Sequence, residues 1–474
     1  MSPDPVEDLH QSEIENPPGA LTDETELQAG GALAESGGLG YLRLRVAQYA
    51  FLFVSTLLVT RILGPTGRAQ YALPLALAGA IWVVTNLTLE ISAARLLARR
   101  DASVERLVAS LSLCLLLLSS VGVSLTLAIG LTERDVLLAD ASGTMVVLAA
   151  LTIPFLLMYQ FAGQILVVLG KLREQGIATA MGGAIQLVMV LVLAIADRIT
   201  PTSALAAALV GFASTGLLVT LMLARELGAR ALFPTIDQKT LRPLVRSGLI
   251  LHPGSVALQL DPRLSLILVG AFLSSHATGL YSLSLTLASS VLLASQALTI
   301  SAVHKQYAED ERRAADFTLA FTRQSFLIMV GVALVIAPLA YPFVVLVYGG
   351  AFAGGTAPFI VLLVVAIAFA VEAPCRVLLV RIAPPLTVTS IVCASILVNA
   401  GLTIALIQVL SITGAALAAV ASYWMLAMIM LHVVTSRTGH SPREVFKWPR
   451  QDDEAIRLLR TAVARLRPNA ARAP

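Results

Sequence analysis

Charged residues are scarce in this sequence: Asp, Glu, Lys and Arg together make up 13% of its 474 residues, whereas 57% are hydrophobic. With a mean hydropathy of +0.83, this balance excludes a soluble globular enzyme and indicates a polytopic membrane protein. Cysteine is scarcer still. Because Cys114, Cys375 and Cys393 lie inside apolar runs without metal-binding spacing, we interpret them as small core residues.

Motifs for catalysis and cofactor binding are also missing. The sequence has no G-x-x-x-x-G-K-[S/T] loop to hold ATP phosphates, no H-E-x-x-H, no Cys/His cluster and no G-x-S-x-G turn. We therefore expect neither an enzyme nor a metal, cofactor or nucleic-acid site.

Basic residues are absent from the first 40 residues, which carry nine acidic side chains and no apolar core. We predict that residues 1–40 form an acidic, disordered cytoplasmic tail and not a cleaved signal peptide. The rest of the chain keeps all 33 basic residues against 20 acidic ones. Such a surplus suits anionic lipid or an anionic substrate.

Twelve apolar runs are long enough to cross a bilayer as helices. The loops between them alternate in charge: sixteen Lys or Arg residues fall on one side and four, Arg61, Arg68, Arg134 and Arg198, on the other. The positive-inside rule then places both termini in the cytoplasm. The external loops are short, which argues against an enzyme that needs an external catalytic domain. The runs cover residues 42–63, 69–93, 106–130, 144–169, 177–196, 203–224, 247–272, 278–302, 318–346, 356–380, 386–409 and 412–435.

Internal similarity divides these runs into two sets of six. SALAAALVGF at 203–212 aligns with GAALAAVASY at 414–423, and Tyr71 aligns with Tyr281 at nearly the same shift. We predict an all-α polytopic membrane protein whose twelve transmembrane helices form two six-helix lobes, related by a pseudo-two-fold axis along the membrane normal. The predicted N-lobe, cytoplasmic linker, C-lobe and cytoplasmic tail with an amphipathic helix are residues 41–224, 225–245, 246–436 and 437–474.

The seventh run is the most unusual, because Asp261 and Arg263 lie in its middle. A charge near the membrane centre costs roughly 2.5–3.5 kcal/mol on insertion scales, so such residues usually face a protein interior or a watery cavity. Pro253 and Pro262 predict two breaks in the same helix. The pattern indicates a helix that lines a central aqueous cavity.

Polar side chains on this helix also fall on one face. Ser255, Gln259 and Arg263 follow each other at four-residue spacing, with His252 just below them. Asp261 has two open interpretations, an ion pair with an arginine of another helix or a role in cation coupling.

The first run begins with Arg43 and Arg45. Both could be interfacial anchors that extend toward the cytoplasm, or Arg45 could turn inward and help bind an anionic head group.

Other polar residues lie inside the predicted spans. Glu90 is expected at the cytoplasmic interface near Arg95, and Glu372 is expected to pair with Arg376 one turn along the tenth helix. Lone amides could line the cavity or bridge helices, and bridging is their commoner role in membranes. They are Gln160, Gln164, Gln186, Gln296 and Asn399.

Residues 60–72, T-R-I-L-G-P-T-G-R-A-Q-Y-A, resemble the start of polysaccharide-repeat-unit flippases of the multidrug/oligosaccharidyl-lipid/polysaccharide exporter superfamily. Gly279-Leu280-Tyr281 and residues 412–417 extend the resemblance through the twelve-helix body. Gly64 and Pro65 independently predict a tight turn between two spans. Relatives often have R-x-D in the seventh helix, whereas Ser265 follows Arg263 here and the acid is Asp261.

The resemblance implies a substrate and a membrane. The substrate would be an oligosaccharide on undecaprenyl diphosphate, moved from the cytoplasmic to the outer leaflet of a bacterial inner membrane by alternating access. Arginines facing the cavity would bind the diphosphate through fork-shaped hydrogen bonds, Arg263 first, then Arg45 and Arg43. We expect a monomer that works with a polysaccharide polymerase or glycosyltransferase.

Three other functions stay open. A cation-coupled exporter of hydrophobic compounds would have an acid-rich cavity and would tolerate loss of Arg263. A non-transporting scaffold of envelope assembly would depend on its tails. A peptidoglycan-precursor flippase would have additional helices and more basic residues in its first two spans.

Overall fold

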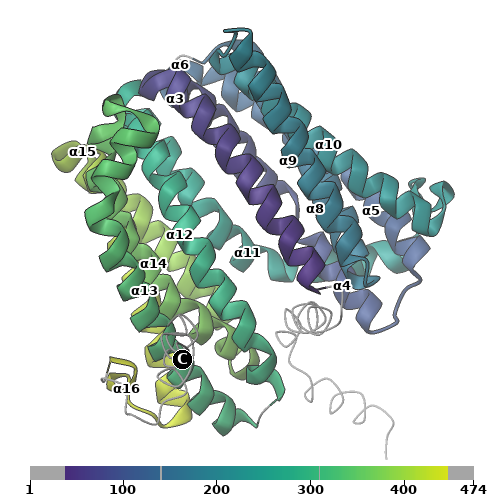
Figure 1. Cartoon of the computed structure of the whole chain (residues 1–474). Coiled ribbons are helices and arrows are strands. Elements are labelled where there is room, and N and C mark those ends of the chain that lie inside the picture. Colours follow the sequence, from purple (N-terminus) through teal and green to yellow (C-terminus); the bar gives the residue numbers. More distant parts are fainter. Residues whose placement is uncertain (1–37, 139–140, 309, 447–474) are drawn as a thin grey trace, which may run out of the picture.

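The computed structural model describes residues 38–138, 141–308 and 310–446, and every regular element within these ranges is a helix. The acidic tail predicted at 1–40 and the amphipathic stretch at 452–467 fall almost wholly outside them. The elements, labelled as in Figure 1, are α3 (Gly38–Thr85), α4 (Leu89–Ala98), α5 (Val104–Thr132), α6 (Arg134–Leu137), α7 (Gly143–Ala150), α8 (Thr152–Val168), α9 (Leu172–Ile195), α10 (Pro201–Leu227), η1 (Ala229–Leu232), α11 (Gln238–Phe272), α12 (Ser275–Ala308), α13 (Glu311–Tyr348), η2 (Gly350–Gly355), α14 (Thr356–Ile382), α15 (Pro385–Thr438) and α16 (Arg443–Phe446).

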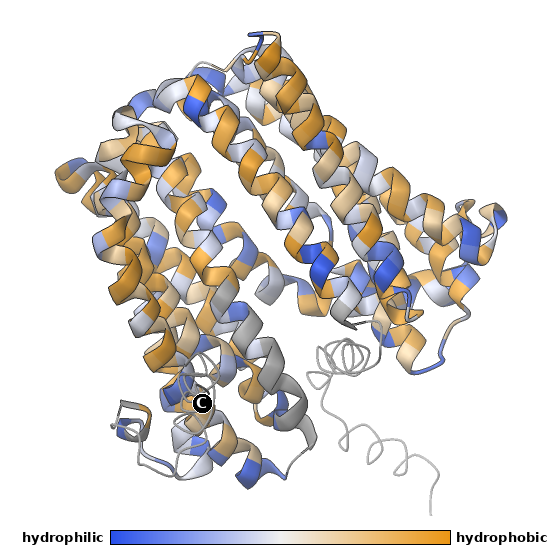
Figure 2. Ribbon diagram, viewed as in Figure 1, coloured by the Kyte–Doolittle hydropathy of each residue, from blue (hydrophilic) through white to orange (hydrophobic). Residues whose placement is uncertain are grey.

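Nine helices of the described residues are long and apolar enough to cross a membrane. Figure 2 shows hydrophobic residues along the lengths of the helices and hydrophilic ones concentrated near their ends. Large apolar side chains are also exposed on the outside, such as Val409 at 80% and Leu346 at 74%. In water such a surface would be unfavourable, whereas lipid covers it at no cost. The chain is an all-helical membrane protein.

Two of these helices, α3 with 48 residues and α15 with 54, are far too long for one crossing. Each turns back in the middle. At 1.5 Å per residue, 27 residues of straight helix would span about 40 Å. Yet the Ser395 hydroxyl in α15 donates to the carbonyl of Ser422 at 3.1 Å. The turn is at Ser411, with a φ of 53°, and the corresponding turn in α3 is at Gly64, with a φ of 66°. The turn predicted at Gly64 and Pro65 is confirmed.

The helices pack in two groups on either side of α3 and α11. Figure 1 shows α5, α8, α9 and α10 on one side and α12 to α15 on the other. Helix α3 packs against both α9 and α12, and α11 packs against α3, α4, α12 and α15. The helices that carry the predicted site therefore lie where the two groups meet.

The three prolines of α11 do not break it: the helix continues from Gln238 to Phe272. The two breaks predicted at Pro253 and Pro262 are therefore wrong. Each proline removes a single backbone donor, and both rings are exposed, so the remaining hydrogen bonds hold the helix together. The break is instead in the second predicted span, between Thr85 and Leu89.

Two arginines that the sequence analysis placed in external loops bond α3 to helices of the second group. Arg61 donates to the carbonyls of Leu346 and Val347, where the last turn of α13 offers unpaired acceptors. Arg68 is buried, 3% exposed, and donates to the Thr286 hydroxyl of α12 at 2.7 Å. Its placement in a loop was wrong, because it lies four residues inside the helix that follows the Gly64 turn.

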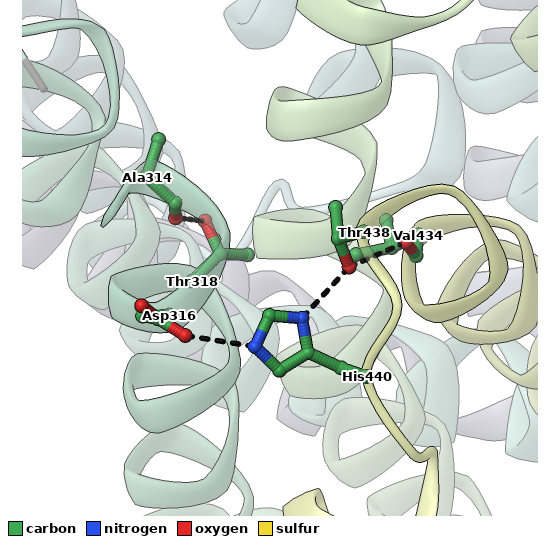
Figure 3. A network of polar contacts seen from close by, with 6 residues as sticks. All are labelled: Ala314, Asp316, Thr318, Val434, Thr438 and His440. Carbon is green, nitrogen blue, oxygen red and sulfur yellow. Dashed lines mark hydrogen bonds and ion pairs between the residues drawn. The ribbon is translucent and has the colours of Figure 1, made fainter. Parts of the chain in front are cut away.

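At the other end of the second group, His440 connects α15 to α13. Its Nε2 lies 2.8 Å from Asp316 Oδ1, and its Nδ1 lies 3.0 Å from the Thr438 hydroxyl, which donates to the carbonyl of Val434 (Figure 3). This network fixes the end of α15 beside the first turns of α13.

Candidate functional site

The predicted polar face of α11 is formed as expected. The Gln259 amide donates to the Ser255 hydroxyl at 3.0 Å, and the Arg263 guanidinium donates to the Gln259 carbonyl. Three side chains at four-residue spacing thus form one continuous polar stripe.

Arg263 points from this stripe toward α3. Its Cζ lies 5.8 Å from the centre of the Trp82 ring, a cation–π distance. A Cβ on Gly79 would lie only 2.7 Å from the Arg263 Nε, so the missing side chain makes room for the guanidinium. No acidic side chain of the described residues pairs with this half-buried arginine. Its positive charge is therefore available to an anion.

Asp261 lies only two residues away but faces the second group of helices. Its side chain is buried, and its Oδ1 accepts from the Asn399 amide of α15 at 2.7 Å. Asn399 also donates to Ser265 at 3.3 Å, and Tyr423 hydrogen-bonds to Asp261. The interpretation of Asp261 as partner of an arginine is wrong for the described residues, since its partners there are neutral.

A pocket opens beside Asp261. It has about 470 Å³ of empty space, part of which is open to the outside, and its polar lining includes Asp261, Ser265, Tyr281 and Tyr423. The carboxylate and hydroxyl groups of this lining are oxygen ligands of the kind that small hard cations prefer. The arrangement can hold a proton or a small cation.

Arg45 of the first span is held by aromatic rings. Its Cζ lies 5.9 Å from the Tyr41 ring and 5.3 Å from the Tyr49 ring, and its Nη1 donates to Gln48 at 2.8 Å. Tyr159 of α8 also hydrogen-bonds to it. Rings and amides orient the guanidinium without neutralising it. Like Arg263, Arg45 has no acidic partner among the described residues.

The remaining predicted side chains have different surroundings. Arg43 is exposed, and no contact within the described ranges places it with the others. His252 contacts the break in the second span: its Nε2 lies 2.8 Å from the Val84 carbonyl, and its Nδ1 lies 3.1 Å from the Thr88 hydroxyl. Because Leu87 and Thr88 both have left-handed backbone conformations, His252 provides side-chain partners where helical bonds are lost. It supports the helix that Arg263 packs against.

Two further carboxylates are buried. Glu90, expected at the cytoplasmic interface near Arg95, is buried inside the protein at 3% exposed and accepts from the Gln160 amide at 3.0 Å. The predicted pair between Glu372 and Arg376 is confirmed at 2.7 Å, although Glu372 itself is fully buried. Across the described residues, no group of three or more His, Cys, Asp or Glu side chains could hold a metal ion.

Sequence reasoning missed the neighbours of these side chains. Gly79 and Trp82 beside Arg263, Tyr159 beside Arg45 and Tyr423 beside Asp261 come from other helices. Tyr41 and Tyr49 lie four residues either side of Arg45 on α3, so helical spacing could have found them. A glycine inside a long apolar helix is a weak signal of close approach, and Gly79 could have been noted for that reason.

Known structures share this fold. A MOP superfamily transporter from Pyrococcus furiosus Vc1 is 13% identical with a TM-score of 0.60, over 90% of this chain and 99% of that chain. An inward-facing multidrug resistance MATE family transporter is 14% identical with a TM-score of 0.65, over 82% of this chain and 94% of that chain. The lipid II flippase MurJ, in an inward closed conformation, is 14% identical with a TM-score of 0.62, over 86% of this chain and 89% of that chain.

The sequence itself identifies the family. No curated protein sequence matches the chain. A family profile described as polysaccharide biosynthesis protein matches residues 38–303, more than half of the chain. The chain therefore belongs to the polysaccharide biosynthesis protein family, with the fold of MOP superfamily transporters.

Proposed function

We propose that the protein is a flippase that moves an undecaprenyl-diphosphate-linked oligosaccharide from the cytoplasmic to the outer leaflet by alternating access. The observation that carries this proposal is the half-buried guanidinium of Arg263, which has no acidic partner in the described residues and lies against the bare backbone of Gly79. A cation in the apolar middle of a membrane helix costs free energy, and such residues are usually found where they have a function. Binding a diphosphate through charge-assisted hydrogen bonds is such a function.

Two cations could bind the diphosphate in turn. Arg45 lies about two turns from the described beginning of α3, which is the predicted cytoplasmic end, and Arg263 lies deeper, on α11. A head group could first contact Arg45 and then transfer to Arg263. Arg43, exposed beside Arg45, would add attraction at the cytoplasmic surface.

The architecture we propose has twelve spans in two six-helix lobes. The turns at Gly64 and Ser411 each divide one long helix into two spans, and α12, with α11, begins the second lobe. Both termini would be cytoplasmic, in the inner membrane of a bacterium, with the acidic tail outside the lobes. Residues 225–245 would link the two lobes. A monomer would suffice, since each chain would supply both lobes.

Asp261 would couple transport to a proton or cation. It lies in the second lobe, away from the substrate face, so occupation of its pocket could shift the packing of α11 against α15. Polymerase or glycosyltransferase partners would act on the same lipid-linked oligosaccharide before or after the flippase moves it.

A second candidate function is a cation-coupled exporter of hydrophobic compounds, and the buried carboxylate of Asp261 in its pocket favours it. Both functions are tested in vesicles that contain the purified protein. We expect movement of a labelled polyprenyl-diphosphate oligosaccharide across the bilayer. Movement of a hydrophobic cationic dye and not of the lipid would overturn the flippase and support the exporter.

A further inference from the structure

A second pocket lies inside the first group of helices, between α3, α8, α9 and α10. It has about 460 Å³ of empty space, part of which is open to the outside. None of its lining residues is charged. Its polar groups are Gln48, Tyr159, Gln186 and Thr215, and aromatic walls come from Phe155 and Phe212.

Gln186 has hydrogen-bonding capacity that the protein does not use. The side chain is 8% exposed, yet no group of the described residues bonds its amide. Its polar atoms are not sealed in the packing, because they meet the open space of the pocket. Because these atoms reach the open space of the pocket, a molecule bound there can pair with them.

The helix packing around Gln186 keeps its amide in place. A Cβ on Gly211 would lie 2.6 Å from the Gln186 Oε1, so only glycine leaves the amide where it is. Gln48 contributes from the opposite wall. Its Oε1 is occupied by Arg45 at 2.8 Å, and its Nε2 can still donate. The pocket is therefore directly beside the cation that would bind the diphosphate.

We propose that this pocket binds one uncharged pyranose ring of the lipid-linked oligosaccharide, so that the protein selects its substrate by sugar as well as by diphosphate. Two amides and a phenol can pair with ring hydroxyls, which both donate and accept. The aromatic walls suit the apolar face of a pyranose. An acidic sugar fits less well, because a lining without charge does not compensate the desolvation of a carboxylate. This inference rests on the proposed function.

The test is binding of two probes to the full-length protein in lipid nanodiscs. One probe is a polyprenyl diphosphate carrying a single N-acetylhexosamine, and the other is the same polyprenyl diphosphate without sugar. We expect the wild type to bind the sugar-bearing probe about tenfold more tightly, the equivalent of one or two hydrogen bonds. Gln186→Leu should abolish that difference and leave the affinity for the bare diphosphate unchanged.

The matched control is Gln175→Leu, which makes the same change on the same helix at a residue that is also 8% exposed but outside the pocket lining. It should keep the tenfold preference. If Gln186→Leu does not fold, Gly211→Ala replaces it, with Gly331→Ala as control because a Cβ there meets nothing within 4 Å.

The outcomes separate two failures. Equal binding of both probes by the wild type, or equal loss of preference in Gln186→Leu and Gln175→Leu, would overturn the sugar pocket alone. If the wild type binds neither probe, the proposed function fails and the pocket assignment fails with it.

Discussion

Asp261 and Arg263 are two residues apart on one helix, yet their surroundings are opposite. Two residues of α-helix correspond to a rotation of about 200°, so the side chains point to opposite sides. Asp261 lies among neutral hydrogen-bonding partners of the second group, whereas Arg263 lies against an aromatic ring and a bare glycine of α3. Protein groups pair with the Asp261 carboxylate, whereas no acid among the described residues pairs with Arg263, so its charge can pair with a ligand.

The largest effect should come from removing the arginine. We expect Arg263→Ala to weaken binding of a polyprenyl diphosphate by roughly 10- to 100-fold, because hydrogen bonds to charged groups contribute about 1.5–3 kcal/mol. Arg263→Lys should recover only part of the affinity, since an ammonium lacks the planar fork. Binding is measured on the purified variants in nanodiscs. Unchanged affinity in both would show that this face of α11 does not bind the substrate.

A smaller effect should follow from filling the space beside the arginine. Gly79→Ala puts a methyl group where the Arg263 Nε lies, so the guanidinium must move while its charge stays. We expect about tenfold weaker binding of the same probe, since misplaced hydrogen bonds lose most of their energy. Gly331→Ala is the control, because its Cβ meets open space. Equal affinities in the two variants would argue that the position of Arg263 is unimportant.

The acid side of the helix should respond in stability. Asn399→Leu removes the amide that donates to Asp261 and leaves a buried carboxyl oxygen without that donor. We expect the free energy of unfolding to fall by about 1–3 kcal/mol, measured by denaturation in detergent. Arg263→Ala should lower it less, because Arg263 has no acidic partner among the described residues and the change leaves no buried charge unpaired. If Arg263→Ala destabilises the protein as much as Asn399→Leu does, the contrast between the two faces is wrong.

The smallest effect concerns Asp237, the N-cap residue of α11, the helix that carries both Asp261 and Arg263. Asp237 accepts from the Thr240 hydroxyl and from the Lys239 backbone N–H. The Thr240 bond first, and then the Lys239 bond, lower the pKa of the Asp237 carboxyl. A lowered pKa stabilises the fold above the ordinary Asp pKa, and this contribution disappears as the pH falls through the lowered value. Asp237→Ala should therefore reduce the unfolding temperature slightly at neutral pH.

The pH dependence provides the control for this last change. The difference in unfolding temperature between wild type and Asp237→Ala should shrink as the pH approaches the acidic range. A difference that stays constant with pH would mean that the carboxylate does not cap the helix.

Most of the fold could be predicted from apolar runs and turn residues. Gly64 needs a left-handed φ, and Gly followed by Pro announced that turn. The second turn, at Ser411, has no such signal, and only the boundary between the apolar runs 386–409 and 412–435 marked it. The prolines of α11 were misleading, because a proline weakens a helix locally and the surrounding packing decides whether it breaks.

The site was predictable only along one helix. Spacing placed Ser255, Gln259 and Arg263 on one face, because helical periodicity is a local property. The partners of Arg263 and Asp261 come from helices far away in sequence, and periodicity says nothing about which helices meet. Arg68 shows the same limit, since its burial depends on α12 and not on its own segment.

The most direct measurement is the transbilayer movement of lipid-linked oligosaccharide in cells with equal amounts of wild type, Arg263→Ala and Asp261→Asn. We expect Arg263→Ala to leave the precursor in the cytoplasmic leaflet, whereas Asp261→Asn should slow its export without stopping it. Normal export by both variants would contradict the assignment of α11 as the substrate-binding helix.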